Sequence, residues 1–220
     1  MRSTRRIFLQ QSAGVALAAH AGAAAAAAAT PAHAGGDLLS RMVWLNEPAA
    51  AHYSEGVLTV RSKGKTDFWR KTFYGYVTDN GHFMYVPMLG EFTLQARIAG
   101  NYSALYDQAG LMVRLDDKHW MKCGSEFVEG KRWASVVFTH DFSDWSTMED
   151  LSQNGAVYWR VLRKKDSLEV QLSKDGEVFT TIRQGYFPAT VQVDVGVMCA
   201  APEGSGFDST CDQLEISQLK

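Results

Sequence analysis

A succession of short strand-like segments constrains the fold more than any other feature of this sequence. About twelve segments are rich in Val, Phe, Tyr or Thr and are bounded by turn residues, a pattern typical of β-strands. Tight-turn signals such as Asp79-Asn80-Gly81 and Asn154-Gly155 separate neighbouring segments. The expected strands cover residues 57–62, 68–76, 82–86, 92–99, 109–115, 119–127, 133–140, 156–164, 167–173, 178–184, 191–199 and 211–219.

Many short strands with little helical periodicity predict an all-β fold, an antiparallel sandwich of two sheets rather than a parallel α/β fold. A single short helix is expected, at residues 148–153. The sequence shows no internal repeat and no linker. We therefore expect one domain over residues 35–220.

Residues 1–34 have the composition of an export signal. Thr4-Arg5-Arg6-Ile7-Phe8-Leu9 contains paired arginines, an alanine-rich apolar run covers 15–29, and Ala32-His33-Ala34 fits the cleavage rule. The apolar run is too weakly hydrophobic for a permanent membrane anchor, and no second stretch of spanning length follows. The pattern predicts a bacterial protein exported by the twin-arginine route to the periplasm or the medium.

The paired arginines lead to the first testable prediction. Replacing Arg5-Arg6 by Lys-Lys should leave the precursor in the cytoplasm, because the twin-arginine receptor reads the arginine pair. Immunoblots of cytoplasmic and exported fractions measure the effect. Unchanged export of the double variant would contradict the prediction.

Charge and cysteine usage exclude several classes of function. Residues 35–220 hold 19 Lys and Arg against 24 Asp and Glu, a net charge of −5 without a basic tract, which argues against nucleic acid as a partner. Of the three cysteines, Cys199 and Cys211 flank a Gly/Pro/Ser loop and are the best disulfide pair, with three buried free thiols as the alternative. The four histidines of 35–220 form no metal-binding motif. No metal and no cofactor is predicted.

One strand-like segment, residues 119–127, indicates a binding site. In a strand, alternate side chains share a face, so Trp120, Lys122 and Glu126 lie together if the strand continues regularly past Gly124. An aromatic ring, an amine and a carboxylate on one face suit the floor of a polar cleft. The alternative is an ordinary solvated outer face.

Two further regions supply candidates for the rim of that cleft. The expected loop 140–146 concentrates polar and aromatic groups, among them His140, Asp144 and Trp145. Residues 68–76 hold five aromatic side chains, which either stack on sugars or fill the core. Arg163 is a weaker candidate for the cleft, with the alternative that its stem covers an aromatic ring.

Several motifs of the sequence are distinctive in combination, among them Asp67-Phe68-Trp69-Arg70, residues 108–114, Trp120-Met121-Lys122 and Ser143-Asp144-Trp145-Ser146. Together they resemble a domain-of-unknown-function family of the concanavalin A-like lectin/glucanase superfamily, to which a yeast protein labelled a regulator of enolase belongs. The resemblance covers nearly all of residues 40–219. It implies a concanavalin A-like jelly-roll sandwich with a concave sheet, and no particular activity.

These observations favour an exported, lectin-like carbohydrate-binding module without catalytic activity. The enzyme alternative is a glycoside hydrolase or polysaccharide lyase that uses Glu126 with Asp144 or His140. The E-x-D-x-x-E pattern of the superfamily's glucanases does not occur in the sequence, however. A third alternative is a protein-interaction module, which the enolase-linked relative suggests.

Overall fold

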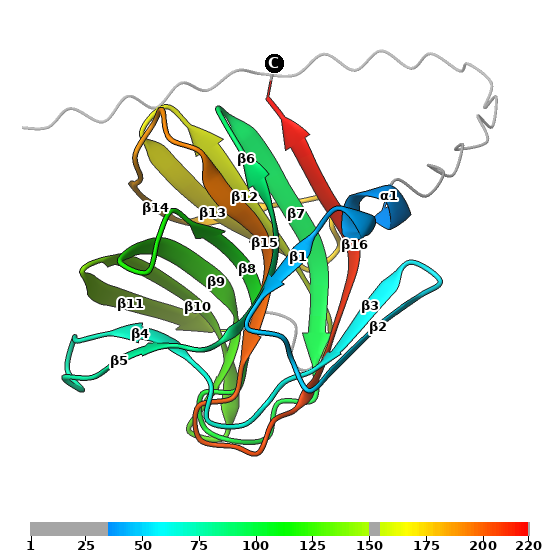
Figure 1. Ribbon diagram of the computed structural model, residues 1–220, viewed down its shortest axis with the longest axis vertical. Helices are drawn as coiled ribbons and strands as arrows, with labels where there is room; N and C mark the ends of the chain where they lie inside the picture. Colours follow the sequence, from blue (N-terminus) through cyan, green and yellow to red (C-terminus); the bar gives the residue numbers. More distant parts are fainter. Residues whose placement is uncertain (1–34, 150–154, 220) are drawn as a thin grey trace, which may run out of the picture. The chain divides into compact units, whose positions relative to one another are not determined.

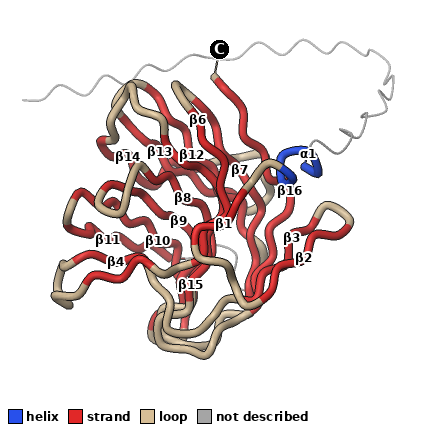
Figure 2. Tube along the Cα trace, viewed as in Figure 1, coloured by secondary structure: helices blue, strands red, loops and turns tan. Residues whose placement is uncertain are grey.

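The computed structural model describes residues 35–149 and 155–219, and these form the two-sheet antiparallel sandwich expected from the sequence (Figures 1 and 2). The one helix in the described residues is the short α1 (Gly35–Ser40). The predicted export signal lies outside the described residues.

Each of the two main sheets has seven strands. The first sheet has the order β1-β6-β15-β8-β9-β10-β11. Its strands are β1 (Val43–Leu45), β6 (His82–Met88), β15 (Val193–Ala200), β8 (Gln108–Arg114), β9 (His119–Val128), β10 (Lys131–His140) and β11 (Phe142–Glu149).

The second sheet has the order β14-β13-β12-β7-β16-β3-β2. Its strands are β14 (Thr180–Tyr186), β13 (Ser167–Ser173), β12 (Val157–Lys164), β7 (Phe92–Gly100), β16 (Asp208–Gln218), β3 (Val57–Arg61) and β2 (Ala50–Ser54). A separate hairpin of β4 (Phe68–Arg70) and β5 (Val77–Asp79) completes the fold.

Alternation along β9 decides which side chains enter the core. Met121 and Cys123 are buried in the main apolar cluster between the sheets, together with Trp159 of β12. Trp120, Lys122 and Glu126 lie on the opposite face, as predicted, because β9 pairs with β10 without a register shift over its whole length. This outer face of the first sheet is where the β4–β5 hairpin packs.

Two facing glycines bring β8 and β9 close together. Gly110 pairs directly with Gly124. A Cβ atom on Gly110 would lie 1.9 Å from the carbonyl oxygen of Cys123, and one on Gly124 would lie 2.2 Å from that of Ala109. Only glycine fits where these two paired backbones lie so close together.

Two local predictions were wrong. The segment expected to be a polar loop and then a helix forms strand β11, which pairs with β10 after a one-residue turn at Asp141. Asp141 has a φ of 63°, a left-handed conformation that aspartate tolerates, and this allows the chain to reverse there. The predicted helix is therefore strand at 148–149, and its residues 150–153 lie outside the described residues.

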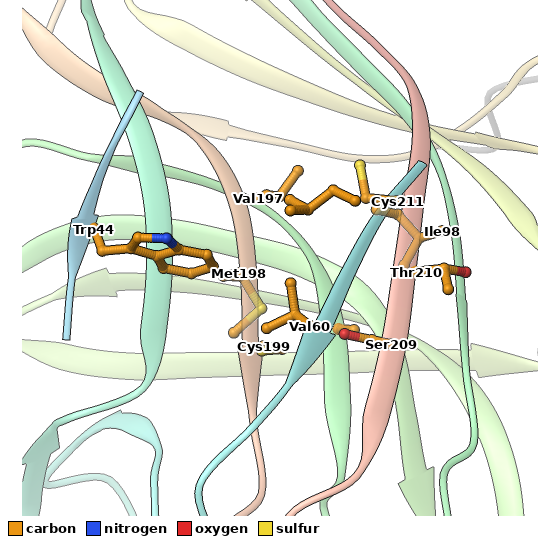
Figure 3. Close-up of a pocket in the computed structure, with 11 residues that line it drawn as sticks. Trp44, Val60, Ile98, Val197, Met198, Cys199, Ser209, Thr210 and Cys211 are labelled. Atoms are coloured by element: carbon orange, nitrogen blue, oxygen red, sulfur yellow. The ribbon is translucent and has the colours of Figure 1, made fainter. Parts of the chain in front are cut away.

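The cysteines form no disulfide. Cys123, Cys199 and Cys211 are all buried free thiols. Cys199 comes from β15 and Cys211 from β16, one strand of each sheet, and both line a small pocket between the sheets (Figure 3). Burial raises the pKa of Cys199 to about 12, so the thiol stays protonated at neutral pH.

No helix among the described residues is long and apolar enough to span a bilayer. Within the same residues, His, Cys, Asp and Glu side chains form no group of three suited to hold a metal ion.

Candidate functional site

A pocket of about 320 Å³ opens between the β4–β5 hairpin and the outer face of the first sheet. Polar side chains from β8 and β9 form its floor, and aromatic side chains form its walls. The pocket is lined by Asp67, Trp69, Tyr74, Tyr76, Tyr106, Gln108, Lys122, Glu126 and Trp145. Such a combination of a few fixed polar groups with aromatic walls is typical of small-molecule sites.

Lys122 is the centre of the polar floor. Its ammonium donates to the carbonyl oxygen of Phe68 at 2.7 Å and lies 3.2 Å from Oδ1 of Asp67. Gln108 Nε2 donates to the same Oδ1 at 3.3 Å, and the backbone N–H of Phe68 donates to it at 2.7 Å. Lys122, Asp67 and Gln108 are all buried, so the hairpin and the sheet are joined by a fixed network of charge-assisted hydrogen bonds.

Glu126 and Trp145 form the second polar unit. The indole Nε1 of Trp145 donates both to Glu126 Oε2 and to Ser135 Oγ, each at 3.0 Å. Burial raises the pKa of Glu126, and the nearby Lys122 and the hydrogen bonds from Ser135 and Trp145 oppose that shift. Trp145 is 39% exposed while Glu126 is buried, so the indole presents a ring to solvent above a fixed carboxyl group.

Three tyrosines complete the rim. Tyr74 and Tyr106 share a hydrogen bond of 2.8 Å between their hydroxyl groups, which joins the tip of the hairpin to the loop before β8. Tyr74 stacks on Tyr76, with ring centroids 5.5 Å apart, and Tyr106 meets Trp145 edge-on at 6.5 Å. Because Tyr74, Tyr76 and Trp145 are all partly exposed, their rings are available to a ligand.

Trp120 does not belong to the pocket, although it shares a face with Lys122 and Glu126. Its side chain is 1% exposed. Phe68 of the hairpin packs against it edge-on at 6.2 Å, and Lys122 Nζ lies 5.7 Å from its ring. The hairpin therefore covers the ring that the sequence predicted as a stacking platform, and Trp120 is buried beside the pocket.

Three other candidates lie away from the pocket. Asp144 precedes Trp145 on β11 and so points to the opposite face, where it pairs with Arg183 at 2.9 Å. His140 lies on the same side, with Nε2 3.1 Å from the carbonyl oxygen of Tyr186. Arg163 is 0% exposed in the second sheet, bound to the carbonyl groups of Pro188 and Ala189.

The pocket thus brings together Lys122, Glu126 and Trp145 of the seven candidates. Sequence reasoning missed Asp67, Gln108 and Tyr106, which come from turns and strand ends with no periodic signal. Tyr74 and Tyr76 belong to the aromatic cluster at 68–76, whose members occupy different environments in the fold. Phe68 is buried, whereas the two tyrosines line the pocket.

The second pocket, which Figure 3 shows, is lined mainly by apolar side chains. Trp44, Val60, Ile98, Val197 and Met198 line it, with Ser209 and Thr210 as its hydroxyl-bearing members. It lies between strands of both sheets, and among the described residues no charged side chain lines it. We regard it as a packing gap in the core.

The raised pKa of Glu126 predicts a pH-dependent stability. Since folding raises this pKa above its ordinary value of 4.5, the folded state retains the proton to higher pH than the unfolded chain. The contribution of Glu126 is fully present below the unfolded pKa and is lost as pH rises through the folded pKa. Wild type should therefore lose free energy of unfolding relative to Glu126→Gln as pH rises above 4.5. Urea denaturation of both proteins across this range checks it, and two parallel stability curves would contradict it.

The fold and the pocket define a β-sandwich protein whose solved neighbours include a GH43 protein and a carbohydrate binding module. A GH43 protein from Bacillus licheniformis is 12% identical, with a TM-score of 0.65 over 81% of this chain and 37% of that one. The carbohydrate binding module CBM66 from Bacillus subtilis is 10% identical, with a TM-score of 0.53 over 80% of this chain and 95% of that one. At these identities the likeness is one of fold alone.

The chain belongs to the family described as "Protein of unknown function (DUF1349)", which it matches over residues 44–219. A relative from Saccharomyces cerevisiae, named Regulation of enolase protein 1, is 41% identical over 81% of this chain and 90% of the relative. A crystal structure of a functionally unknown protein from the same yeast superposes with a TM-score of 0.79 at 39% identity, over 83% of this chain and 98% of that one. The resemblance inferred from the sequence motifs is thereby confirmed.

Proposed function

We propose that this protein is an exported, non-catalytic carbohydrate-binding module whose site is the pocket around Lys122, Glu126 and Trp145. One observation carries the proposal: buried, hydrogen-bonded polar groups lie directly below partly exposed aromatic rings in one pocket. Aromatic faces stack on the C–H faces of sugars, while carboxylate, amide and ammonium groups exchange hydrogen bonds with sugar hydroxyls. Export by the twin-arginine signal would bring this pocket into contact with extracellular glycans.

The floor is already ordered before any ligand arrives. Lys122, Asp67 and Gln108 are fixed by one another, and Glu126 is fixed by Trp145 and Ser135. A preorganised site loses less conformational entropy on binding than a flexible one, which helps a small ligand to bind. The fold of CBM66 and of the GH43 protein supports a sugar ligand by analogy.

Removing the exposed indole tests the proposal directly. Residues 35–220 should bind at least one glycan of a plant and bacterial polysaccharide array, and Trp145→Ala should weaken that binding by about 1–2 kcal/mol, roughly five- to thirtyfold. Isothermal titration calorimetry measures the loss. Tyr53→Ala is the matched control, since Tyr53 of β2 is 37% exposed and lies outside the pocket. A wild type that binds no glycan would contradict the proposal.

A second candidate function is a glycoside hydrolase or polysaccharide lyase. The raised pKa of the buried Glu126 favours it, since a general acid must keep its proton near neutral pH. Asp144 and His140 point away, so Asp67 is the other carboxylate in the same pocket. Glu126→Gln separates the candidates: an enzyme would lose turnover by about a hundredfold or more while still binding. A binding module would show no product release with either protein.

A further inference from the structure

The charges in the pocket are unfavourable for an anionic ligand. Among the pocket-lining residues of the described chain, Asp67 and Glu126 are carboxylic acids and Lys122 is the only cation. The Lys122 ammonium already lies 3.2 Å from Asp67 and donates to the Phe68 carbonyl at 2.7 Å. A ligand carboxylate would therefore compete with Asp67 for one buried cation rather than find an unpaired one.

Protonation of Glu126 would not change this conclusion. With Glu126 neutral, the floor holds one cation and one anion in a direct pair. With Glu126 ionised, the floor carries a net negative charge. In neither state is there an excess positive charge to offset the loss of hydration of an acidic sugar.

The rim tyrosines are subject to the same negative field. Burial raises the pKa of Tyr76, and the charges of Asp67 and Glu203 add to the shift. The hydrogen bond with Tyr74 raises the pKa of Tyr106, and burial and the charge of Glu126 add to it. The carboxylate charges thus add to the raised pKa of Tyr76 and Tyr106, after burial and the hydrogen bond between Tyr74 and Tyr106.

Cations just beyond the lining residues already have carboxylate partners. Arg70 lies 3.2 Å from Asp117 and 3.5 Å from Asp141, and Lys71 lies 3.6 Å from that same Asp141. A neutral sugar has no such requirement, since its hydroxyl groups can donate to the carboxylates and accept from Lys122 or Gln108.

We propose that the pocket selects uncharged sugar residues and rejects sugars that carry a carboxylate or sulfate group. The inference rests on the proposed carbohydrate-binding function and deepens it by naming the ligand class. Selection of this kind works through repulsion of the wrong ligand as much as through attraction of the right one.

Matched glycan pairs test the proposal. Tetrasaccharides of glucose, galactose and mannose are titrated calorimetrically against residues 35–220, each beside its uronate counterpart with a carboxylate at C6. The neutral member of the binding pair should bind about tenfold tighter or more, given the Coulomb repulsion expected inside a protein site. Its affinity should also be nearly unchanged between about 20 and 500 mM salt, since a neutral ligand makes no ion pair for salt to screen.

The outcomes separate the two proposals. Equal or tighter binding of the uronate would overturn charge selection and leave sugar binding intact. No binding by any glycan would remove the sugar function, and the inference with it.

Two variants test which carboxylate of the pocket causes the preference for neutral sugars. Asp67→Asn releases Lys122 from its carboxylate partner, and Glu126→Gln removes the second charge but keeps an acceptor for Trp145. Asp67→Asn should reduce the preference for the neutral sugar about tenfold. Glu126→Gln should keep a preference for the neutral sugar, because Asp67 still pairs with Lys122. Asp212→Asn is the control, because Asp212 pairs with Arg97 on the second sheet at 2.9 Å. An unchanged preference in Asp67→Asn, with native circular dichroism, would also overturn the proposal.

Discussion

Gly110→Val should cost the protein about 4 kcal/mol or more and leave most of the chain unfolded or insoluble. A Cβ atom at this position would lie 1.9 Å from the backbone oxygen of Cys123, and backbone atoms of a central strand cannot move aside. The substitution would separate β8 from β9, which carry Gln108, Lys122 and Glu126 of the pocket floor. Losses of this size are exceptional for single substitutions and have an identifiable steric cause.

The control for this variant is Gly90→Ala. Gly90 has a φ of 80°, and a Cβ atom there would have no neighbour within 4 Å. The expected loss is about 1–2 kcal/mol, from backbone strain alone. Urea denaturation followed by circular dichroism compares the two variants. A Gly110→Val protein as stable as Gly90→Ala would show that the two backbones can separate without loss of the fold.

Lys122→Met should destabilise the protein by about 3–5 kcal/mol, because it leaves Asp67 buried without its charged partner. Methionine has a similar length and fills the space of the lysine stem, so loss of packing contributes little. The same substitution removes the central hydrogen-bond donor of the pocket. Glycan binding should therefore fall below detection even under conditions where the variant is folded.

Lys65→Met provides the matched comparison. Lys65 pairs with Glu203 at 3.4 Å, but its side chain is 71% exposed. Exposed pairs contribute little, so a change within about 0.5 kcal/mol is expected. Denaturant titrations of both variants give the difference. Equal small losses would show that Asp67 finds water or another donor when Lys122 is removed.

The sandwich was predictable because strand signals are local. The alternation of Trp120, Lys122 and Glu126 predicts their shared face correctly, since β9 is regular past Gly124. Which part of that face is open to solvent depends on the β4–β5 hairpin, whose contact with Trp120 spans more than fifty positions of sequence. No local pattern reports such a contact, so burial of Trp120 could not be deduced from periodicity.

The prediction of a loop after His140 was wrong for a different reason. Its concentration of polar residues looks like a loop, yet it is an edge strand with a solvated surface. Once it is recognised as a strand, alternation places Asp144 and Trp145 on opposite faces, and only one of them can belong to the pocket. Asp67, Gln108 and Tyr106 could not have been found this way, because they meet only where a turn, a strand end and a loop converge.

The three unpaired thiols make the covalent structure of the folded domain independent of its surroundings. Cys123, Cys199 and Cys211 lie out of reach of solvent oxidants, and burial holds the pKa of each thiol above its ordinary value. Assembly therefore requires neither an oxidising enzyme nor a disulfide isomerase. A domain built in this way can complete its folding in a reducing cytoplasm and then function unchanged in an oxidising environment, as the proposed twin-arginine export would require.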